Sequence, residues 1–328
     1  MRVVAIGGGT GLSTVLRGLK YHVSEPARPA QFRPEITRLT AVVTVTDEGG
    51  SSGRLRRDFR ILPPGDIRNC LVALAEDEQL LTQIFNYRFS SGHGLRGHNL
   101  GNLFLTALTN LFHDFAKAVR LSSEVLAIRG EIFPATLSDV HLKATRIDGK
   151  VIRGERSITR TRLPIQRLQI VPSNCKPLPE TLAAIREADL ITFGPGSLYT
   201  SLVPNLLVKG IAKEIAGARA AKVLICNLMT QPGESRGYSA ADHIKALHEH
   251  AGRKVFDHIV LNTRPLSPAL LKRYAAEHAA PVLLDLDAIR KLGVKPLCAD
   301  LLIEDHVARH DARHLTKLLL SLAKKRSR

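Results

Sequence analysis

Short apolar runs alternate with amphipathic stretches along most of the chain. Residues 2–6 form a β-branched run that ends at glycines, and a helical pattern follows from about Thr10. A second apolar run covers 39–45, and the same rhythm returns after residue 178. The later pattern predicts helices at 178–187 and 311–325 and strands at 189–193, 222–226, 257–261 and 281–285. This alternation is typical of a doubly wound sheet, so we expect an α/β fold with a mostly parallel sheet.

The segment from Pro63 to about Phe115 departs from this rhythm because its spacing is helical throughout. Asp66 follows a Pro-Pro-Gly turn and is the expected N-cap of one helix. Apolar residues at helical spacing predict a second, long and largely buried helix over His98–Val119.

Residues 125–171 change character again, since apolar and polar positions alternate there. Asp148-Gly149 stands between two such alternating runs, which is a good hairpin signal. We therefore expect a small antiparallel β insertion at 125–171, placed within a single domain that spans 1–328.

The basic charge bears on what the protein binds. Lys and Arg number 47 against 30 Asp and Glu, a net charge of +17, and many of the basic residues fall between Lys143 and Arg167. Such a field attracts phosphorylated metabolites, nucleic acid or an acidic membrane surface. No aromatic residue interleaves with this cluster to stack on bases, which disfavours specific nucleic-acid binding.

Cysteine spacing and hydropathy argue against a disulfide-rich, zinc-binding or membrane-spanning protein. The 4 cysteines lie far apart without a Cys-x-x-Cys pair, so neither a disulfide framework nor a structural zinc site is expected, and reduced thiols fit the cytosol. No apolar run reaches the roughly 18 residues of a membrane span. We expect a cytoplasmic protein without such a span.

The turn Gly7–Leu12 lies directly between the first strand and the first helix. Glycines let the backbone approach a phosphate, and a helix N-terminus offers free N–H groups and a positive dipole end. The turn lacks the third glycine of a strict dinucleotide fingerprint and the Gly-Lys-Ser/Thr ending of a P-loop. A phosphate site and a tight turn without a ligand both remain open.

The second candidate is the loop Asp47–Arg56, where two carboxylates precede glycines, hydroxyls and arginines. This composition suits metal-assisted phosphate handling, with Asp47, Asp66 and Mg²⁺ holding a diphosphate. A solvated loop whose Asp and Glu side chains pair with the arginines would have the same composition, so this alternative remains open.

Further polar turns lie at Pro63–Asn69, Gly97–Leu103, Ala188–Asn205 and Asn227–Glu234. Ligands of open α/β sheets bind beyond the carboxyl ends of the strands, so we expect several of these turns to meet at one site. A lone His such as His98 is also common as a structural residue. The predicted ligand contacts are Gly8, Gly9, Thr10, Gly11, Ser51, Ser52, Arg54, Asn69, His98, Asn102, Gly194, Gly196, Ser197, Asn205, Asn227 and Thr230.

Taken together and in order, these motifs resemble the bacterial gluconeogenesis factor (YvcK-like) family, which is distantly related to 2-phospho-L-lactate transferase. The resemblance implies a Rossmann-like fold, a cytoplasmic location and binding of a nucleotide-sugar of the UDP-N-acetylglucosamine type. It also implies a role in cell shape and envelope synthesis on gluconeogenic carbon sources, and it implies no catalysed reaction. Glu48 stands where that family usually has Asp and reaches one methylene further.

Three functions follow as hypotheses. The first is a nucleotide-sugar-binding regulatory protein, with protein partners in envelope synthesis or a homo-oligomer left open. The second is a metal-dependent transferase that acts on a nucleotide diphospho-compound through Asp47 and Asp66. The third is nucleic-acid binding through the Lys143–Arg167 cluster.

Overall fold

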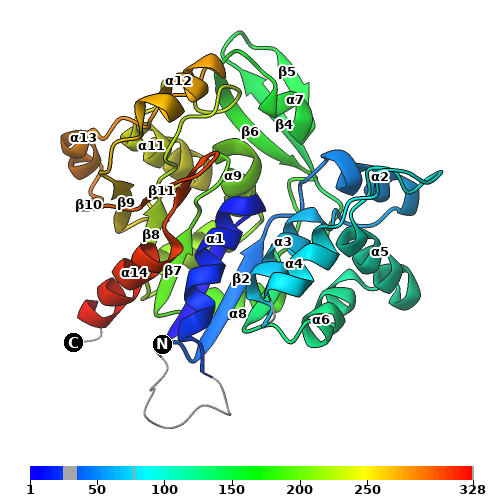
Figure 1. Cartoon of the computed structure of the whole chain (residues 1–328). Helices are drawn as coiled ribbons and strands as arrows, with labels where there is room; N and C mark the ends of the chain where they lie inside the picture. Colours follow the sequence, from blue (N-terminus) through cyan, green and yellow to red (C-terminus); the bar gives the residue numbers. More distant parts are fainter. Residues whose placement is uncertain (25–34, 77, 327–328) are drawn as a thin grey trace.

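The computed structural model describes residues 1–24, 35–76 and 78–326 (Figure 1). Its centre is a seven-stranded sheet with the strand order β10-β9-β8-β7-β1-β2-β3. Each neighbouring pair in this sheet is parallel. The strands are β1 (Arg2–Gly7), β2 (Arg38–Val43), β3 (Glu131–Pro134), β7 (Leu190–Phe193), β8 (Ala221–Ile225), β9 (His258–Asn262) and β10 (Lys295–Ala299). The expected doubly wound α/β fold is confirmed, and its order is that of a Rossmann-like sheet.

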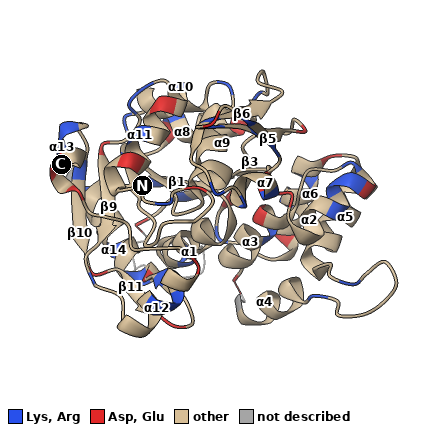
Figure 2. Cartoon of the chain, turned by 90° about the horizontal axis from the view of Figure 1, so that it is seen from above, with Lys and Arg blue, Asp and Glu red and all other residues tan. Residues whose placement is uncertain are grey.

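Helices cover both faces of the sheet (Figures 1 and 2). On one face α1 (Gly9–Leu19) packs between α3 (Gly65–Leu74) and α14 (Ala312–Arg326). The other face carries α8 (Pro179–Glu187), α9 (Val203–Leu207), α10 (Ile211–Gly217), α11 (Ala240–Ala251) and α13 (Leu286–Lys291). The predicted apolar face of α1 is buried in full at Leu12, Val15, Leu16 and Leu19, so the helix is held by the sheet and by α14.

The helical region after Pro63 consists of several shorter helices. Helix α3 begins at Gly65 after Pro64, so Asp66 lies in its first turn and is not the predicted cap. Then come α4 (Glu78–Asn86), α5 (Leu100–Phe112) and α6 (Phe115–Val125). The single long helix predicted over 98–119 is wrong, because His113 turns left-handed at φ 53° and Asp114 caps a new helix. Helix α5 is not largely buried, since its Leu111 is 69% exposed.

The antiparallel insertion is smaller than predicted. Residues up to Val125 still belong to α6, and β3 joins the main sheet next to β2. The insertion proper consists of β4 (His141–Arg146), β5 (Val151–Arg153), α7 (Glu155–Thr159) and β6 (Ile165–Val171), with the sheet order β5-β4-β6. The hairpin at Asp148-Gly149 is confirmed, with Gly149 at φ 78°.

The C-terminal third differs from the expectation in one strand. Residues 281–285 form isolated bridges at Pro281 and Leu283 and no strand, since the chain turns there into α13. The edge strand β10 and the hairpin β11 (Leu302–Glu304) to β12 (Ala308–His310) were not predicted, because their exposed, mixed patterns carry little period-2 signal. Helix α12 (Pro268–Ala276) precedes α13 in the connection from β9 to β10.

The remaining helices are short or lie at turns. Helix α2 (Gly50–Phe59) begins inside the predicted Asp47–Arg56 loop, and single turns η1 (Lys20–His22) and η2 (Leu198–Leu202) follow α1 and β7. Residues 25–34, in the Pro-rich connection between α1 and β2, lie outside the described part of the chain. No helix in the described part of the chain is both long and apolar enough to cross a bilayer.

Candidate functional site

The site lies where the chain changes direction across the sheet. Strands β1 and β7 are neighbours, β2 and β3 follow on one side, and β8, β9 and β10 follow on the other. A crevice forms at such a switch point beyond the carboxyl ends of the strands. Here it is a cavity of about 1190 Å³, lined by the turns after β1, β7 and β8, by the first turn of α3, by α7 and by β12.

The turn after β1 brings backbone amides to the cavity. Gly8 is extended and precedes α1, and Gly9 is left-handed at φ 63°. The backbone of Gly9 faces the Asp66 carboxylate and lowers the pKa of that group, against the larger effect of burial, which raises it. Thr10 and Gly11 follow in the first helical turn, where N–H groups have no acceptor within the helix. These amides and the helix dipole favour an anion.

Close contact with the second glycine turn fixes this geometry. A Cβ atom built at Gly11 would lie 2.2 Å from the carbonyl oxygen of Pro195, and one at Gly8 would lie 2.7 Å from Asp66 Oδ2. Neither position has room for a side chain. The turns after β1 and β7 therefore touch, although Gly11 and Pro195 are 184 positions apart in the sequence.

Three carboxylates face one end of the cavity, Asp47, Asp66 and Glu155. Enclosure by the protein and the nearby charge of Asp47 raise the pKa of Asp66 to about 8. Burial is also the largest cause that raises the pKa of Glu155 to about 7, and Asp47 adds to it. Arg68 lies on the same side and opposes part of this repulsion. Gathered acids of this kind favour a proton or a bound cation.

The donor set fits a cation only in part. Among the described residues, no group of three or more His, Cys, Asp or Glu side chains is arranged to hold a metal ion. Mg²⁺ commonly binds through one or two carboxylates together with substrate phosphates. Asp47 and Asp66 could therefore hold Mg²⁺ that is shared with a diphosphate, and the ion would neutralise charge on that group.

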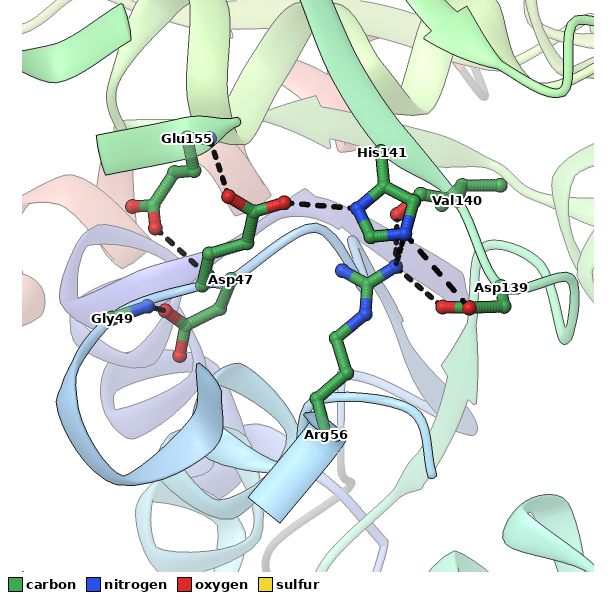
Figure 3. A network of polar contacts seen from close by, with 8 residues as sticks. Asp47, Gly49, Arg56, Asp139, Val140, His141 and Glu155 are labelled. Atoms are coloured by element: carbon green, nitrogen blue, oxygen red, sulfur yellow. Dashed lines mark hydrogen bonds and ion pairs between the residues drawn. The ribbon is translucent and has the colours of Figure 1, made fainter. Parts of the chain in front are cut away.

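Contacts of Glu48 attach the insertion to the acidic end of the cavity (Figure 3). The amide of Glu48 donates to Glu155 Oε2 at 2.9 Å, and the amide of Glu155 donates back to Glu48 Oε2 at 3.1 Å. The other Glu48 oxygen lies 3.0 Å from His141 Nδ1. A Cβ at Gly154 would lie 2.3 Å from Glu48 Oε2, so a glycine is needed there. Helix α7 is thereby held with Glu155 and Thr159 in the cavity wall.

A second attachment of the insertion involves Arg56, whose side chain is 93% buried. Its guanidinium pairs with Asp139 and lies 3.2 Å from His141 Nε2 (Figure 3). Helix α2 and the start of β4 are joined at this point, which fixes the loop that carries Asp47.

The opposite wall is held by side chains from the turn after β8. Asn227 Oδ1 accepts from the amide of Gly196 at 3.0 Å, and its Nδ2 donates to the carbonyl of Gly196 at 2.8 Å. Gln231 donates to Ser197 Oγ at 2.9 Å, and Thr230 accepts from the amide of Ala280 at 3.0 Å. These polar groups bind neighbouring loops and hold the backbone of the wall in place.

Most of the predicted contacts come together in this cavity. Those that line it are Gly8, Gly9, Thr10, Gly11, Asp47, Asp66, Asn69, Gly196, Ser197, Asn227 and Thr230. Those outside its lining are Ser51, Ser52, Arg54, His98, Asn102, Gly194 and Asn205.

The residues outside the lining have partners within the protein. Ser51 Oγ lies 3.0 Å from His98 Nδ1, and Asn102 donates to Ser52 at 3.4 Å, so these four residues connect α2 to the start of α5. Asn205 donates to the carbonyl of Ser201 at 2.8 Å. Ligand contact by these residues stays a prediction.

The prediction did not include several residues that line the cavity. They are Arg17, Arg68, Asn86, Arg88, Asn99, Glu155, Tyr274, Glu277, Arg309 and His310. Arg17 lies on the polar face of an ordinary amphipathic helix, and Tyr274 lies on α12, so neither stands in a motif. Arg68 follows Asp66 directly, and its place in the first helical turn was the signal available.

Comparison with known proteins agrees with this fold. The family model described as 2-phospho-L-lactate transferase CofD matches residues 3–302. The chain therefore belongs to this family.

Within the family, the chain is most usefully compared with curated gluconeogenesis factors. It is 45% identical to the Gluconeogenesis factor of Bacillus subtilis over 98% of both chains. It is 46% identical to that of Halalkalibacterium halodurans, with 97% of this chain and 95% of the relative covered. The crystal structure of a UPF0052 family protein from Bacillus halodurans superposes with a TM-score of 0.90 at 45% identity, covering 97% and 98% of the two chains. The resemblance inferred from the sequence motifs is confirmed.

Proposed function

We propose that the cavity binds a nucleotide-sugar of the UDP-N-acetylglucosamine type and that the protein acts as a regulatory protein. One observation carries this proposal, namely that glycine turns far apart in sequence converge on a single large cavity at the switch point. In this arrangement the diphosphate lies against the amides of Thr10 and Gly11. The volume of about 1190 Å³ exceeds that of a site for one small metabolite.

The two ends of the cavity then serve different parts of the ligand. The nucleoside lies along the turn after β8, against Tyr274 and Arg309, where an aromatic ring and a guanidinium can stack on a base. The sugar lies toward Arg68 and Asn69, which offer hydrogen-bond donors to hydroxyl groups.

The biological part of the proposal draws on the relatives. Their name, Gluconeogenesis factor, supports a role during growth on gluconeogenic carbon sources. We further propose that the protein acts in the cytoplasm and sustains cell shape and envelope synthesis under those conditions. Deletion of the gene should impair growth and shape on such carbon sources and have little effect on glucose. An identical phenotype on both carbon sources would contradict this role.

Calorimetric titration tests ligand binding directly. UDP-N-acetylglucosamine, UDP and GDP are each titrated into the full chain. Saturable heat is expected from both uridine compounds, with weaker binding of GDP. If none of the three gives heat at millimolar concentration, nucleotide-sugar binding is refuted.

A second candidate is a metal-dependent transferase that acts on a nucleotide diphospho-compound. Two carboxylates, Asp47 and Asp66, face the proposed diphosphate position, and the matching family model bears a transferase name. Incubation with nucleotide diphospho-compounds and Mg²⁺, followed by detection of released nucleotide, tests for turnover. Asp47→Asn should abolish any turnover and only weaken binding; turnover that survives this change would exclude a role for Asp47 in the reaction.

A further inference from the structure

The antiparallel sheet of the insertion has two edge strands, β5 and β6. In the order β5-β4-β6, strand β6 pairs with β4 alone. The carbonyl of Leu142 accepts from the amide of Gly154, so the backbone groups of Leu142 point toward β5. Successive residues of a strand direct their backbone groups to opposite sides, so those of Lys143 point toward β6. Lys143 is opposite Gln169 in the register. Leu168 and Ile170 therefore direct their backbone groups away from β4.

A groove of about 850 Å³ runs beside this edge. It is lined by residues 166–174, by Leu207 of α9 and by the end of α11. His250 Nε2 already accepts from the amide of Leu168 at 2.9 Å. Beyond that point, the amide and carbonyl of Ile170 face the groove and have no hydrogen-bond partner among the described residues. The next outward-facing residue, Pro172, has no N–H group, and its carbonyl accepts from the amide of Cys175 at 3.4 Å. An open edge of this kind can pair with an added strand.

The surroundings of the groove are strongly cationic. Residues 141–171 contain 8 Lys or Arg against 2 Asp or Glu. Both acids are occupied elsewhere, because Asp148 pairs with Arg146 and Glu155 faces the site cavity. Lys143 and Arg167 line the groove itself, and Figure 2 colours the Lys and Arg positions along the ribbon blue.

We propose that this edge docks an acidic, extended segment of a partner protein, which adds to β6 as a fourth strand. The segment pairs with the backbone amide and carbonyl of Ile170. It begins after Leu168, whose amide donates to His250, and it extends along the groove toward Asn174. Side chains of a strand alternate between its two faces, so carboxylates at every second position lie near Lys143 and Arg167. Glu249 borders the α11 side of the groove and repels acids there, which fixes the face that the carboxylates take.

A synthetic peptide tests this proposal on the full chain. The probe is a fluorescein-labelled octapeptide of alternating Val and Glu, and binding is measured by fluorescence anisotropy at two salt concentrations. The wild-type protein should bind it saturably, and amide hydrogen exchange in 165–171 should slow when the peptide is bound. The Lys143→Gln, Arg167→Gln double variant should bind at least about tenfold more weakly, because close charge pairs are lost.

Two controls separate strand addition from diffuse attraction. The Arg153→Gln, Arg156→Gln double variant removes the same charge from the β5 side of the insertion, since Arg153 lies opposite Lys143 on β5, and it should keep wild-type affinity to within about twofold. A peptide with N-methyl groups on alternate amides keeps its carboxylates but cannot pair with the edge, so it should bind at least about tenfold more weakly.

Three results would overturn the proposal. Equal losses in the two double variants would mean general charge attraction. Equal binding of the methylated peptide would exclude strand pairing, and unaltered exchange at Ile170 would place the peptide elsewhere. A single-stranded oligonucleotide that binds more tightly than the peptide, and that depends on Lys143 and Arg167, would assign the surface to nucleic acid instead.

Discussion

Replacement of Gly11 by Ala tests whether the glycine turns after β1 and β7 touch as described. The added Cβ would lie 2.2 Å from the Pro195 carbonyl oxygen and 2.7 Å from its carbon. Both atoms belong to the backbone, so no side chain can move aside. One turn must shift by about 1 Å to restore ordinary contact. Overpacking of this kind destabilises a protein by about 1–3 kcal/mol, and the shift would also separate the two walls of the proposed diphosphate position.

The matched control is Gly217→Ala, at the exposed end of α10, where a Cβ would meet nothing within 4 Å. Alanine is favoured over glycine in a helix, so this variant should be as stable as wild type or more stable by about 0.5–1 kcal/mol. Urea denaturation gives both free energies of unfolding, and calorimetry gives the affinity for UDP-N-acetylglucosamine. Wild-type stability and affinity in Gly11→Ala would refute the close contact between the turns.

Three further changes give distinct outcomes. Asn227→Ala removes both hydrogen bonds that join the turns after β7 and β8, so unfolding should become easier by about 2 kcal/mol, while Asn110→Ala on exposed α5 surface should have little effect in the same denaturation assay. Glu48→Asp shortens the side chain that binds His141 and α7, so hydrogen exchange in 154–159 should quicken; unchanged exchange would contradict the attachment. Burial lowers the pKa of His310 from 6.5 to about 4. Below pH 6.5 the unfolded chain therefore binds a proton that the folded chain does not. His310 should then lower stability by up to about 1.4 kcal/mol per pH unit as the pH falls from 6.5 toward 4, and denaturation midpoints of wild type and His310→Asn should converge over that range.

The sequence predicted the central sheet well because its strands are buried on both faces. Apolar runs such as 3–6 and 223–226 mark such strands, and Gly7, directly after the first run, marks where that strand ends. It failed at β10 because an edge strand is partly exposed and its Lys295-Pro296 start reads as a loop. It also merged α5 and α6, since a single left-handed residue at His113 ends the first helix without a glycine to signal it.

The site was harder to predict than the fold because many of its groups come from unrelated segments. Local motifs identified the turns after β1 and β7, where glycines stand directly after apolar runs, and the polar turn after β8, which begins at Asn227. Glu155 reaches the cavity only because Glu48, which is 107 residues away, holds α7 in place. No local pattern carries that information. Arg309 lies on a short hairpin strand that the sequence did not predict.

The contacts within the cavity wall also separate the groups that shape the site from those free to bind a ligand. Asn227, Thr230 and Ser197 were expected to contact a ligand, yet each already makes a hydrogen bond within the wall. A side chain satisfied in this way fixes the position of a loop and has less capacity left for a ligand. The amides at the start of α1 have no such partner inside the helix. Recognition of a phosphate group should therefore depend mainly on the backbone of Thr10 and Gly11, and the polar side chains of the opposite wall should act by holding that wall at the right distance.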